Sequence, residues 1–358
     1  MAFAYKRTIT IDNTKVSASL SNYPVMVKLT TSNFDFTKVR SDGLDIAFYD
    51  TSDTLLDFET EYFEDSTLGV FHVRIPSVSS SVDTTFIMKY GDSKQSTDLS
   101  NKTGVWDSNF VMVQHMGTSL LDSTSNGNNG TNNGTTIVDG LNGKARSFDG
   151  NDYINCGDID LTNLTISYFI KGYTNSNIHV SKRNNSSYSF EMGLDYEYPM
   201  LRINSNSYVA TSSNGLSSSI YTQLVGTFNG SNIKIWQNGV LEATTNYTTA
   251  INQTDADVNI GRRGYIGAEE YTVGTIDEVR ISNITRSNAW ILADDYNLRL
   301  NTLLSISGQS DINIGFNAVN IGGVWKSTVE TKVNIGGVWK KATAVFTNIN
   351  GIWKEDVN

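Results

Sequence analysis

Cysteine and proline are scarce in this sequence of 358 residues, which contains one cysteine and three prolines. A lone Cys156 excludes an intrachain disulfide, so the fold must rest on packing. Because no base lies beside it in the sequence, we expect Cys156 to be a small buried hydrophobe rather than a catalytic thiol. The low proline content also excludes a proline-rich or collagen-like stalk as the main architecture.

Positive charge and long apolar runs are also lacking. The formal net charge is -10, and because phosphate binding needs a basic face, nucleic acid is not an expected partner. No segment approaches the roughly 18 continuous apolar residues of a membrane-spanning helix. The first residues, MAFAYKRTITI, lack the apolar core of a secretion signal. We therefore expect no membrane insertion, synthesis in a host cytoplasm, and release by cell lysis.

The first 115 or so residues consist of short β-branched and aromatic runs between polar turns, which is typical of a β-sandwich. The runs fall at 8–11, 25–29, 45–49, 70–75 and 85–90. The segments YKRTITIDN, RSDGLDIAFYD and FHVRIPSVSSSVDTTFIMKYGD resemble an uncharacterised β-sandwich domain of bacteria, archaea and phages. The resemblance covers residues 5–116 and implies a fold and a laminin-G-like neighbour, but no chemistry.

A second group of motifs follows, in DSTSNGNNGT, GKARSFDGNDYI, YTQLVGTFNGSNIKIWQNGVLEATT and VGTIDEVRISNITRSNAWI. These motifs resemble the laminin-G-like, concanavalin-type lectin jelly roll. Two Asn-Gly turns, at 229–230 and 238–239, favour tight hairpins, and Ser287 is a suitable N-cap for a helix from Asn288 to about Asn297. Tyr221 stands where the family usually has tryptophan, a core role that a tyrosine can fill.

The last residues repeat a short unit, as VNIGGVWK, VNIGGVWK and TNINGIWK, with its tryptophan every 14 residues. Each unit is predicted to be a β-hairpin with a two-residue turn. Isolated hairpins bury little surface, so we expect them to stack on each other and on copies from other subunits, as a homotrimer. The tryptophans assigned to this oligomerisation are Trp325, Trp339 and Trp353. The tract resembles tryptophan-containing repeats of tailed-phage structural proteins.

The predicted fold class is therefore all-β, with two β-sandwich (jelly-roll) domains and a C-terminal stack of three short β-hairpin repeats. The predicted boundaries are 1–117 for the first sandwich, 118–302 for the lectin-like sandwich and 303–358 for the repeats.

Signals of catalysis are poor, and we predict no catalytic residue. The histidines have no metal-ligand spacing, and His72 alternates within an apolar strand, where a core or edge position is the expected role. Three acids alternate along one predicted strand, where they suit a solvated face better than the carboxylate pair of a glycosidase. These acids are Asp57, Glu59 and Glu61.

A calcium site is the best-motivated cofactor prediction. Asp122, Thr124 and Asn126 alternate along a polar loop, as oxygen ligands of a hard cation do. The lectin-like resemblance implies that Asp122 and Asp277 share one Ca²⁺ with loop carbonyls. The alternative is structural: Asp122 and Asn126 form Asx turns, and Asp277 caps a buried backbone group.

Ligand binding is expected from loop aromatics and polar side chains, because sugars stack on rings and bind amides, acids and arginines. The candidates are Tyr196, Tyr198, Arg262, Arg263 and Tyr265. Trp236 is more consistent with a core position.

The function predicted from these features is a structural protein of a tailed-phage virion with a lectin-like, carbohydrate-binding adhesive module. It would act as a tail fibre, receptor-binding or head/tail decoration component, with other virion proteins and a host surface glycan as partners. Surface domains without disulfides or a secretion signal fit assembly inside a host cell. Two alternatives remain: a lectin-fold glycoside hydrolase acting on surface polysaccharide, and a bacterial cell-surface adhesin.

Overall fold

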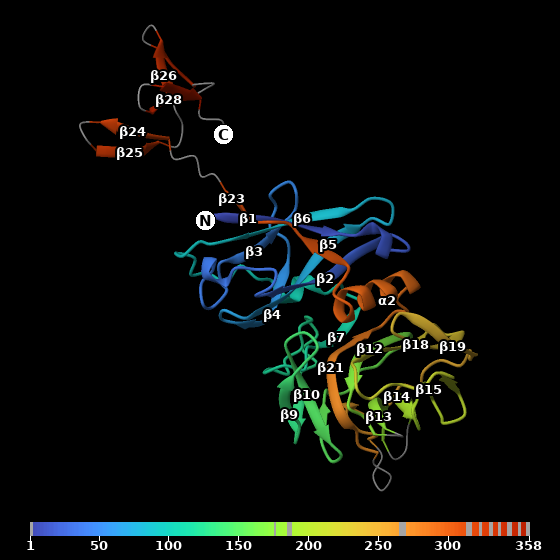
Figure 1. Ribbon diagram of the computed structural model, residues 1–358. Helices are drawn as coiled ribbons and strands as arrows, with labels where there is room; N and C mark the ends of the chain where they lie inside the picture. Colours follow the sequence, from blue (N-terminus) through green and yellow to red (C-terminus); the bar gives the residue numbers. More distant parts are fainter. Residues whose placement is uncertain are drawn as a thin grey trace.

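The computed structural model describes residues 3–174, 177–184, 188–264 and 270–312 in full, and beyond them the backbone of six strands. Two β-sandwiches lie end to end, and three short hairpins follow at the C-terminal end (Figure 1). The prediction of an all-β fold built on sandwiches is confirmed. Among the described residues, no helix is long and apolar enough to cross a membrane.

The N-terminal sandwich pairs a five-stranded sheet with a three-stranded sheet around an aromatic core that includes Phe48, Phe71 and Phe86. The first sheet has the order β22-β1-β6-β3, with β23 also on β1, and the second has the order β2-β5-β4. Short helical turns at Asn13–Lys15 and Phe36–Lys38 lie in connections between the two sheets, and Lys102–Val105 (α1) lies between β6 and the following sandwich. The strands are β1 (Tyr5–Ile11), β2 (Leu20–Thr30), β3 (Ile46–Tyr49), β4 (Phe58–Glu64), β5 (Leu68–Val78), β6 (Thr84–Tyr90), β22 (Leu304–Ile306) and β23 (Ser310–Asp311).

The second sandwich packs an eight-stranded sheet against a seven-stranded sheet. The larger sheet has the order β19-β18-β17-β12-β21-β10-β9, with β7 also paired to β21. Its strands are β7 (Phe110–Gln114), β9 (Thr136–Asp139), β10 (Lys144–Asp149), β12 (Leu164–Lys171), β17 (Thr222–Phe228), β18 (Asn232–Gln237), β19 (Val240–Asn246) and β21 (Val273–Ser282). The smaller sheet has the order β16-β15-β14-β13-β20-β11-β8. Its strands are β8 (Thr131–Asn133), β11 (Tyr153–Asn155), β13 (Ile178–Arg183), β14 (Tyr188–Asp195), β15 (Tyr198–Ile203), β16 (Val209–Thr211) and β20 (Val258–Ile260).

The sheet pairing differs from the predicted boundaries near residues 117 and 302. β7 precedes residue 117, yet it pairs with β21 in the lectin-like sheet. β22 and β23 follow residue 302, yet both pair with β1 and so complete the N-terminal sheet. The lectin-like sandwich is therefore inserted between two parts of the N-terminal one, which ties the two together.

A helical segment fills the junction between the sandwiches. Ser287 caps α2 (Asn288–Asp294) by accepting a hydrogen bond from the backbone N–H of Trp290, as predicted. The helix continues as one π-helical turn, Asp295–Arg299. Within that turn, the buried Asn297 amide accepts from the N–H of Met26 (2.7 Å) and donates to its carbonyl (2.9 Å). This pair of hydrogen bonds fixes the helix to strand β2.

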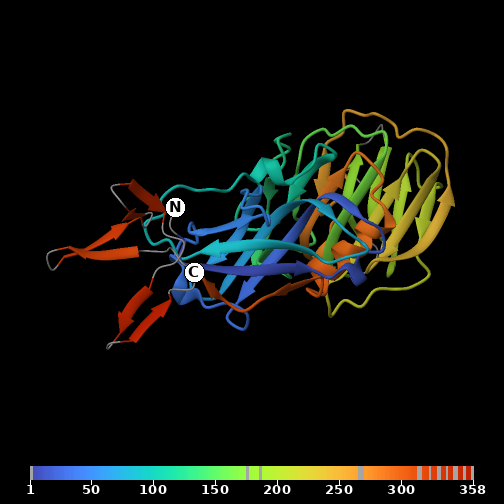
Figure 2. The ribbon, with the colours of Figure 1, turned by 90° about the horizontal axis from the view of Figure 1, so that it is seen from above.

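Each C-terminal repeat forms its own two-stranded hairpin, and Figure 2 shows the three set apart from both sandwiches. The register is the same in all three, because each tryptophan position lies opposite an asparagine, as in Asn320 opposite Trp325. The hairpins are β24 (Asn317–Ile321) with β25 (Val324–Thr328), β26 (Lys332–Ile335) with β27 (Val338–Lys341), and β28 (Phe346–Ile349) with β29 (Ile352–Glu355). The side chains of Trp325, Trp339 and Trp353 lie outside the described part, so their packing and the trimer stay predictions.

Candidate carbohydrate-binding face

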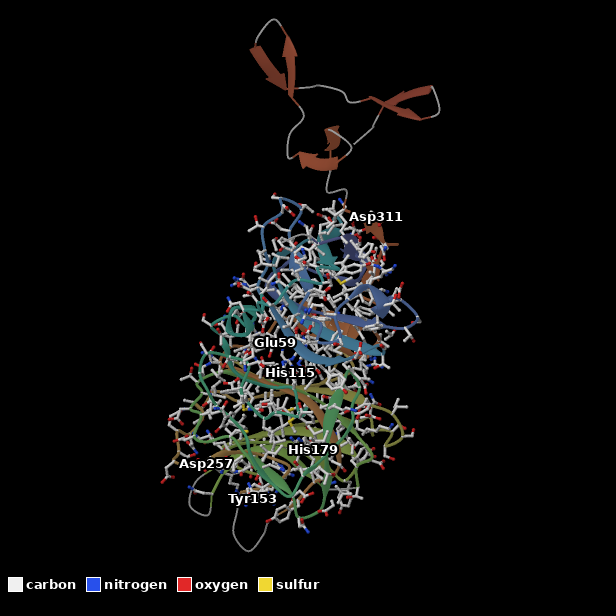
Figure 3. All side chains as sticks on the ribbon, turned by 90° about the vertical axis from the view of Figure 1, so that its left-hand side faces the viewer. Glu59, His115, Tyr153, His179, Asp257 and Asp311 are labelled. Carbon is white, nitrogen blue, oxygen red and sulfur yellow. The ribbon has the colours of Figure 1, made fainter. Side chains whose placement is uncertain are left out.

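The two sheets of the lectin-like sandwich have different surroundings. Strand β21 of the larger sheet contacts the N-terminal sandwich, and Trp236 packs with Ile291 of α2 over the same sheet. Trp236 is 3% exposed, which confirms a core position. The smaller sheet lies on the side away from the N-terminal sandwich, and Figure 3 shows Tyr153 of β11 at the far end of the molecule. The outer face of the smaller sheet is therefore the face that a large ligand can reach.

Strand register separates the two faces of this smaller sheet. Residues directly opposite each other in antiparallel strands point to the same side. One row across five strands is apolar and lies in the core: Leu201, Met192, Val180, Ile260 and Ile154. The next row is polar and points away from the core: Arg202, Glu191, Ser181, Asn259 and Asn155. Glu191, Ser181 and Asn259 are themselves buried, so the half-buried Arg202 and Asn155 are the members of this row that solvent reaches.

Glu191 is the centre of this face, and its side chain is fully buried. It accepts hydrogen bonds from the Tyr188 hydroxyl (2.8 Å), Arg183 Nη1 (3.1 Å) and Arg263 Nε (2.8 Å). Arg202 Nη1 lies 3.7 Å from Oε2 of Glu191. A buried carboxylate is costly unless it is paired in this way, so the arginines and Glu191 hold each other in fixed positions.

The segment after β20 crosses this face and carries two of the predicted ligand-binding residues. The Ser181 hydroxyl donates to the Arg262 carbonyl (2.8 Å), which fixes the segment to the sheet. The Arg262 guanidinium lies 3.5 Å from the ring centroid of Tyr153, a cation–π arrangement. Arg263 also pairs with Glu270 at 2.5 Å. The structure therefore places both arginines on the candidate face as rigid groups.

The remaining predicted ligand-binding residues are tyrosines. Tyr196 and Tyr198 lie at the β14–β15 turn and are 69% and 37% exposed. Tyr198 pairs with Asp195, which lies 4.0 Å from Arg202. The turn thus adds exposed aromatic rings beside the polar row. Tyr265 lies outside the described residues.

The residues predicted to bind calcium are engaged differently. The two oxygens of Asp122 accept from the N–H groups of Val113, Thr124 and Asn128 and from the Thr124 hydroxyl. Four hydrogen bonds use the acceptor positions of a carboxylate, which leaves none for a cation. Asn126 donates to the Phe110 carbonyl.

Asp277 does not share these partners. One of its oxygens accepts from the Leu141 N–H at 2.7 Å, which is the backbone cap of the structural alternative. The arrangement does not fit a calcium ion held jointly by Asp122 and Asp277. Calcium there stays a prediction without support from the geometry.

A cluster of ionisable groups at the junction of the sandwiches was missed by the sequence analysis. Glu59 and the Glu61 side chain are 5% and 3% exposed, so the interpretation of these acids as a solvated face is wrong. The rings of His72 and His115 stack at a centroid distance of 4.8 Å. The sequence offered one indication of this cluster, which was His72 in an apolar strand next to a strand that carries acids. The other members, His115 and Glu278, come from distant parts of the chain.

Burial and neighbouring charges shift the pKa values in this cluster. Burial, reinforced by the charge of Glu278, raises the pKa of Asp277 to about 8. Burial raises the pKa of Glu61 well above its usual range and lowers that of His72 well below. The carboxylates of Glu278 and Glu59 outweigh burial at His115 and raise its pKa. At neutral pH the cluster therefore combines neutral and charged members in a water-poor site.

The comparisons with known proteins concern the lectin-like sandwich. No curated protein matches the chain. A domain of AbnA, a GH43 extracellular arabinanase from Geobacillus stearothermophilus, solved with arabinotriose, is 19% identical, with a TM-score of 0.44, covering 51% of this chain and 97% of that one. The binding domain of botulinum neurotoxin DC, solved with SialylT, is 14% identical, with a TM-score of 0.40, covering 55% of this chain and 52% of that one.

The chain spans about half the length of the toxin binding domains that it matches. Most of the lectin-like sandwich also matches the model of a protein family. Residues 148–292 match the model of the concanavalin A-like lectin/glucanases superfamily, so this part of the chain is similar to the jelly rolls of that superfamily.

Proposed function

We propose that this chain is an adhesive structural protein of a tailed-phage particle, which binds a surface glycan through the outer face of its seven-stranded sheet. The N-terminal sandwich and the hairpin repeats would connect this module to other virion proteins and to further copies of the chain. On this proposal the protein is a tail fibre, a receptor-binding protein or a decoration component.

The observation that carries the glycan-binding part is the outward polar row with its rigid arginines. Sugar recognition uses planar donors and acceptors for hydroxyl pairs and ring faces for the apolar side of the sugar. The half-buried Arg202 and Arg262 supply the first kind of group, and the exposed rings of Tyr196 and Tyr198 supply the second. Because Glu191 fixes the arginines, little side-chain entropy is lost on binding.

The particle part of the proposal rests on the repeats. Three hairpins of identical register follow the sandwiches, each too small to bury a core alone. Such units gain stability from partner surfaces, which an assembled particle supplies. Detection of this chain in purified virions by mass spectrometry would support the proposal, and its absence from them would favour the bacterial adhesin.

The test of glycan binding is an array of bacterial surface glycans probed with the labelled full-length chain. The expected result is retention on a small group of related glycans, with no change in glycan size when the eluates are analysed by mass spectrometry. No retention on any glycan would overturn the assignment of the outer face.

A lectin-fold glycoside hydrolase is the second candidate, because a buried carboxylate, Glu191, lies at the centre of the face. A glycosidase of this kind needs two carboxyl groups across the scissile bond, one of them a proton donor. Glu191 is instead bound by three donors, which suits a positioning role. Release of shorter products by the wild type, lost in Glu191→Gln, would establish the hydrolase.

A further inference from the structure

The junction of the two sandwiches brings together two histidines and two glutamates that are distant in sequence. Glu61 and His72 come from strands β4 and β5 of the N-terminal sandwich, His115 follows β7, and Glu278 lies on β21. One ligand atom of each lies within 4.8 Å of those of the other three. Figure 3 shows His115 at this junction, beside Glu59.

We propose that one transition-metal dication of the zinc type binds here and joins the two sandwiches, held by Glu61, His72, His115 and Glu278. The site is independent of the glycan-binding face, which lies on the opposite sheet.

The spacing of the ligand atoms suits a small dication. Glu61 Oε2 lies 2.8 Å from His72 Nε2 and 3.8 Å from His115 Nδ1, and His115 Nδ1 lies 2.5 Å from Glu278 Oε1. Ligand atoms around a tetrahedral zinc ion stand about 3.3–3.5 Å apart, given bonds of about 2.0–2.2 Å. Side-chain shifts of less than about 1 Å would open the cluster around an ion, with the metal replacing the protons that now bridge the pairs.

Irregular backbone geometry orients the side chains of two proposed ligands, Glu61 and Glu278, toward the metal site. The register between β4 and β5 shifts between Thr60 and Tyr62, so Glu61 is the extra residue of a β-bulge. Glu278 has a φ of 54°, which non-glycine residues rarely adopt, at the register shift between β21 and β12. Bulges re-aim side chains, and such conformations persist where surrounding structure holds them.

Neighbouring groups orient the ligands as outer-shell partners do in metal sites. Glu59 is held by the Trp106 indole N–H (2.9 Å) and the Ser123 hydroxyl (2.6 Å), and its Oε2 lies 3.3 Å from His115 Nε2. With its proton on Nε2, the side that faces Glu59, His115 has Nδ1 free to bind a metal. Arg280 binds Oε2 of Glu278 at 2.7 Å, which leaves Oε1 for the ion.

The charge balance also favours a dication. Before protons or metal are added, four carboxylates face two basic side chains, which leaves a formal charge of −2 in a buried site. The groups are Glu59, Glu61, Asp277 and Glu278 against Arg280 and Lys28. One oxygen of Asp277 is buried without a hydrogen-bond partner among the described residues. A divalent ion neutralises this excess.

The donor set identifies the class of metal. Two imidazoles with two carboxylates suit Zn²⁺ and similar dications, whereas Ca²⁺ takes oxygen ligands alone. The ligand side chains are at most 10% exposed, so the site is closed, as structural zinc sites are. The ion would have a structural role, holding the two sandwiches together, and not a catalytic one.

The test is metal binding by the full-length chain. Chain stripped with a chelator is dialysed against Zn²⁺, then against metal-free buffer, and zinc is measured by mass spectrometry. The expected result is one zinc per chain and a higher melting temperature. Both should be lost in Glu61→Gln and His115→Gln and kept in His179→Gln, which alters a buried histidine outside the cluster. Competition with a chromophoric chelator should show Glu59→Gln weakening zinc binding about 10–100-fold.

Zinc uptake that is absent, or unchanged in both ligand variants, would overturn the proposal. If those variants fail to fold, X-ray absorption at the zinc edge of the wild type decides. A first shell of nitrogen and oxygen at about 2.0–2.2 Å, including imidazole scattering, is expected. A sulfur shell, or an all-oxygen shell, would contradict it.

Discussion

A buried histidine makes the stability of the lectin-like sandwich depend on pH. His179, which is labelled in Figure 3, is fully buried. The hydroxyl of Tyr168 lies 2.8 Å from its Nδ1. Burial lowers the pKa of His179 from 6.5 to about 3. The folded state therefore binds this proton less tightly than the unfolded state. The stabilising contribution is complete above pH 6.5 and is lost as the pH falls toward 3.

The size of the effect follows from linkage. Taking 6.5 for the unfolded chain and about 3 for the folded one, the free energy of unfolding should fall by about 3 kcal/mol between pH 7 and pH 4 through this residue alone. Other groups titrate over the same range, so the quantity to measure is the difference between wild type and His179→Gln. Gln keeps a polar side chain but does not titrate.

Urea unfolding at pH 7 and pH 4 supplies the measurement. The variant should lose about 3 kcal/mol less than the wild type over this interval. Tyr168→Phe is the matched control: it removes the hydrogen-bond partner and leaves the burial, so it should keep the wild-type pH dependence. Equal pH dependence in wild type and His179→Gln would refute the reasoning.

Two further predictions concern the junction and the repeats. Asn297→Ala should leave the N–H and carbonyl of Met26 buried without partners, each at a cost of about 1–3 kcal/mol, measured by urea unfolding. Asn246→Ala, exposed on β19, is the control, and equal stability of the two variants would contradict the role of Asn297. A chain ending at Ile312 retains β22 and β23 and should fold, but light scattering should show a monomer where the full-length chain is an oligomer. An unchanged mass would remove the repeats from oligomerisation.

Local sequence patterns predicted the strands well because burial alternates with the side-chain direction of a strand. The runs at 25–29 and 70–75 fall inside β2 and β5, and Cys156 is 2% exposed, as expected. Strand pairing was harder to foresee. Nothing in FVMVQ or LSI says which sheet they join, since the partners are more than 150 residues away.

The candidate sites were also hard to predict where they depend on contacts between residues distant in sequence. Arg262 and Arg263 were predicted as ligand-binding residues because a polar Gly-containing turn is a local feature. Glu191 was not assigned, because its burial comes from Arg183 and Arg263 on other segments. The acids of β4 alternate as a solvated face does, and only the packing of β7 and β21 against them turns that face into a buried cluster.

The most direct test of the central claim is to locate glycan binding on the outer face of the seven-stranded sheet. A glycan retained by the array would be titrated by calorimetry into the wild type, Tyr198→Ala and Arg202→Ala, with Arg40→Ala on the N-terminal sandwich as the control. Stacking on an aromatic side chain such as Tyr198 and a hydrogen bond from a charged group such as Arg202 are each worth about 1–3 kcal/mol. The face variants should therefore bind about 5-fold to 150-fold more weakly, and the control should be unchanged. Wild-type affinity in both face variants would contradict the account.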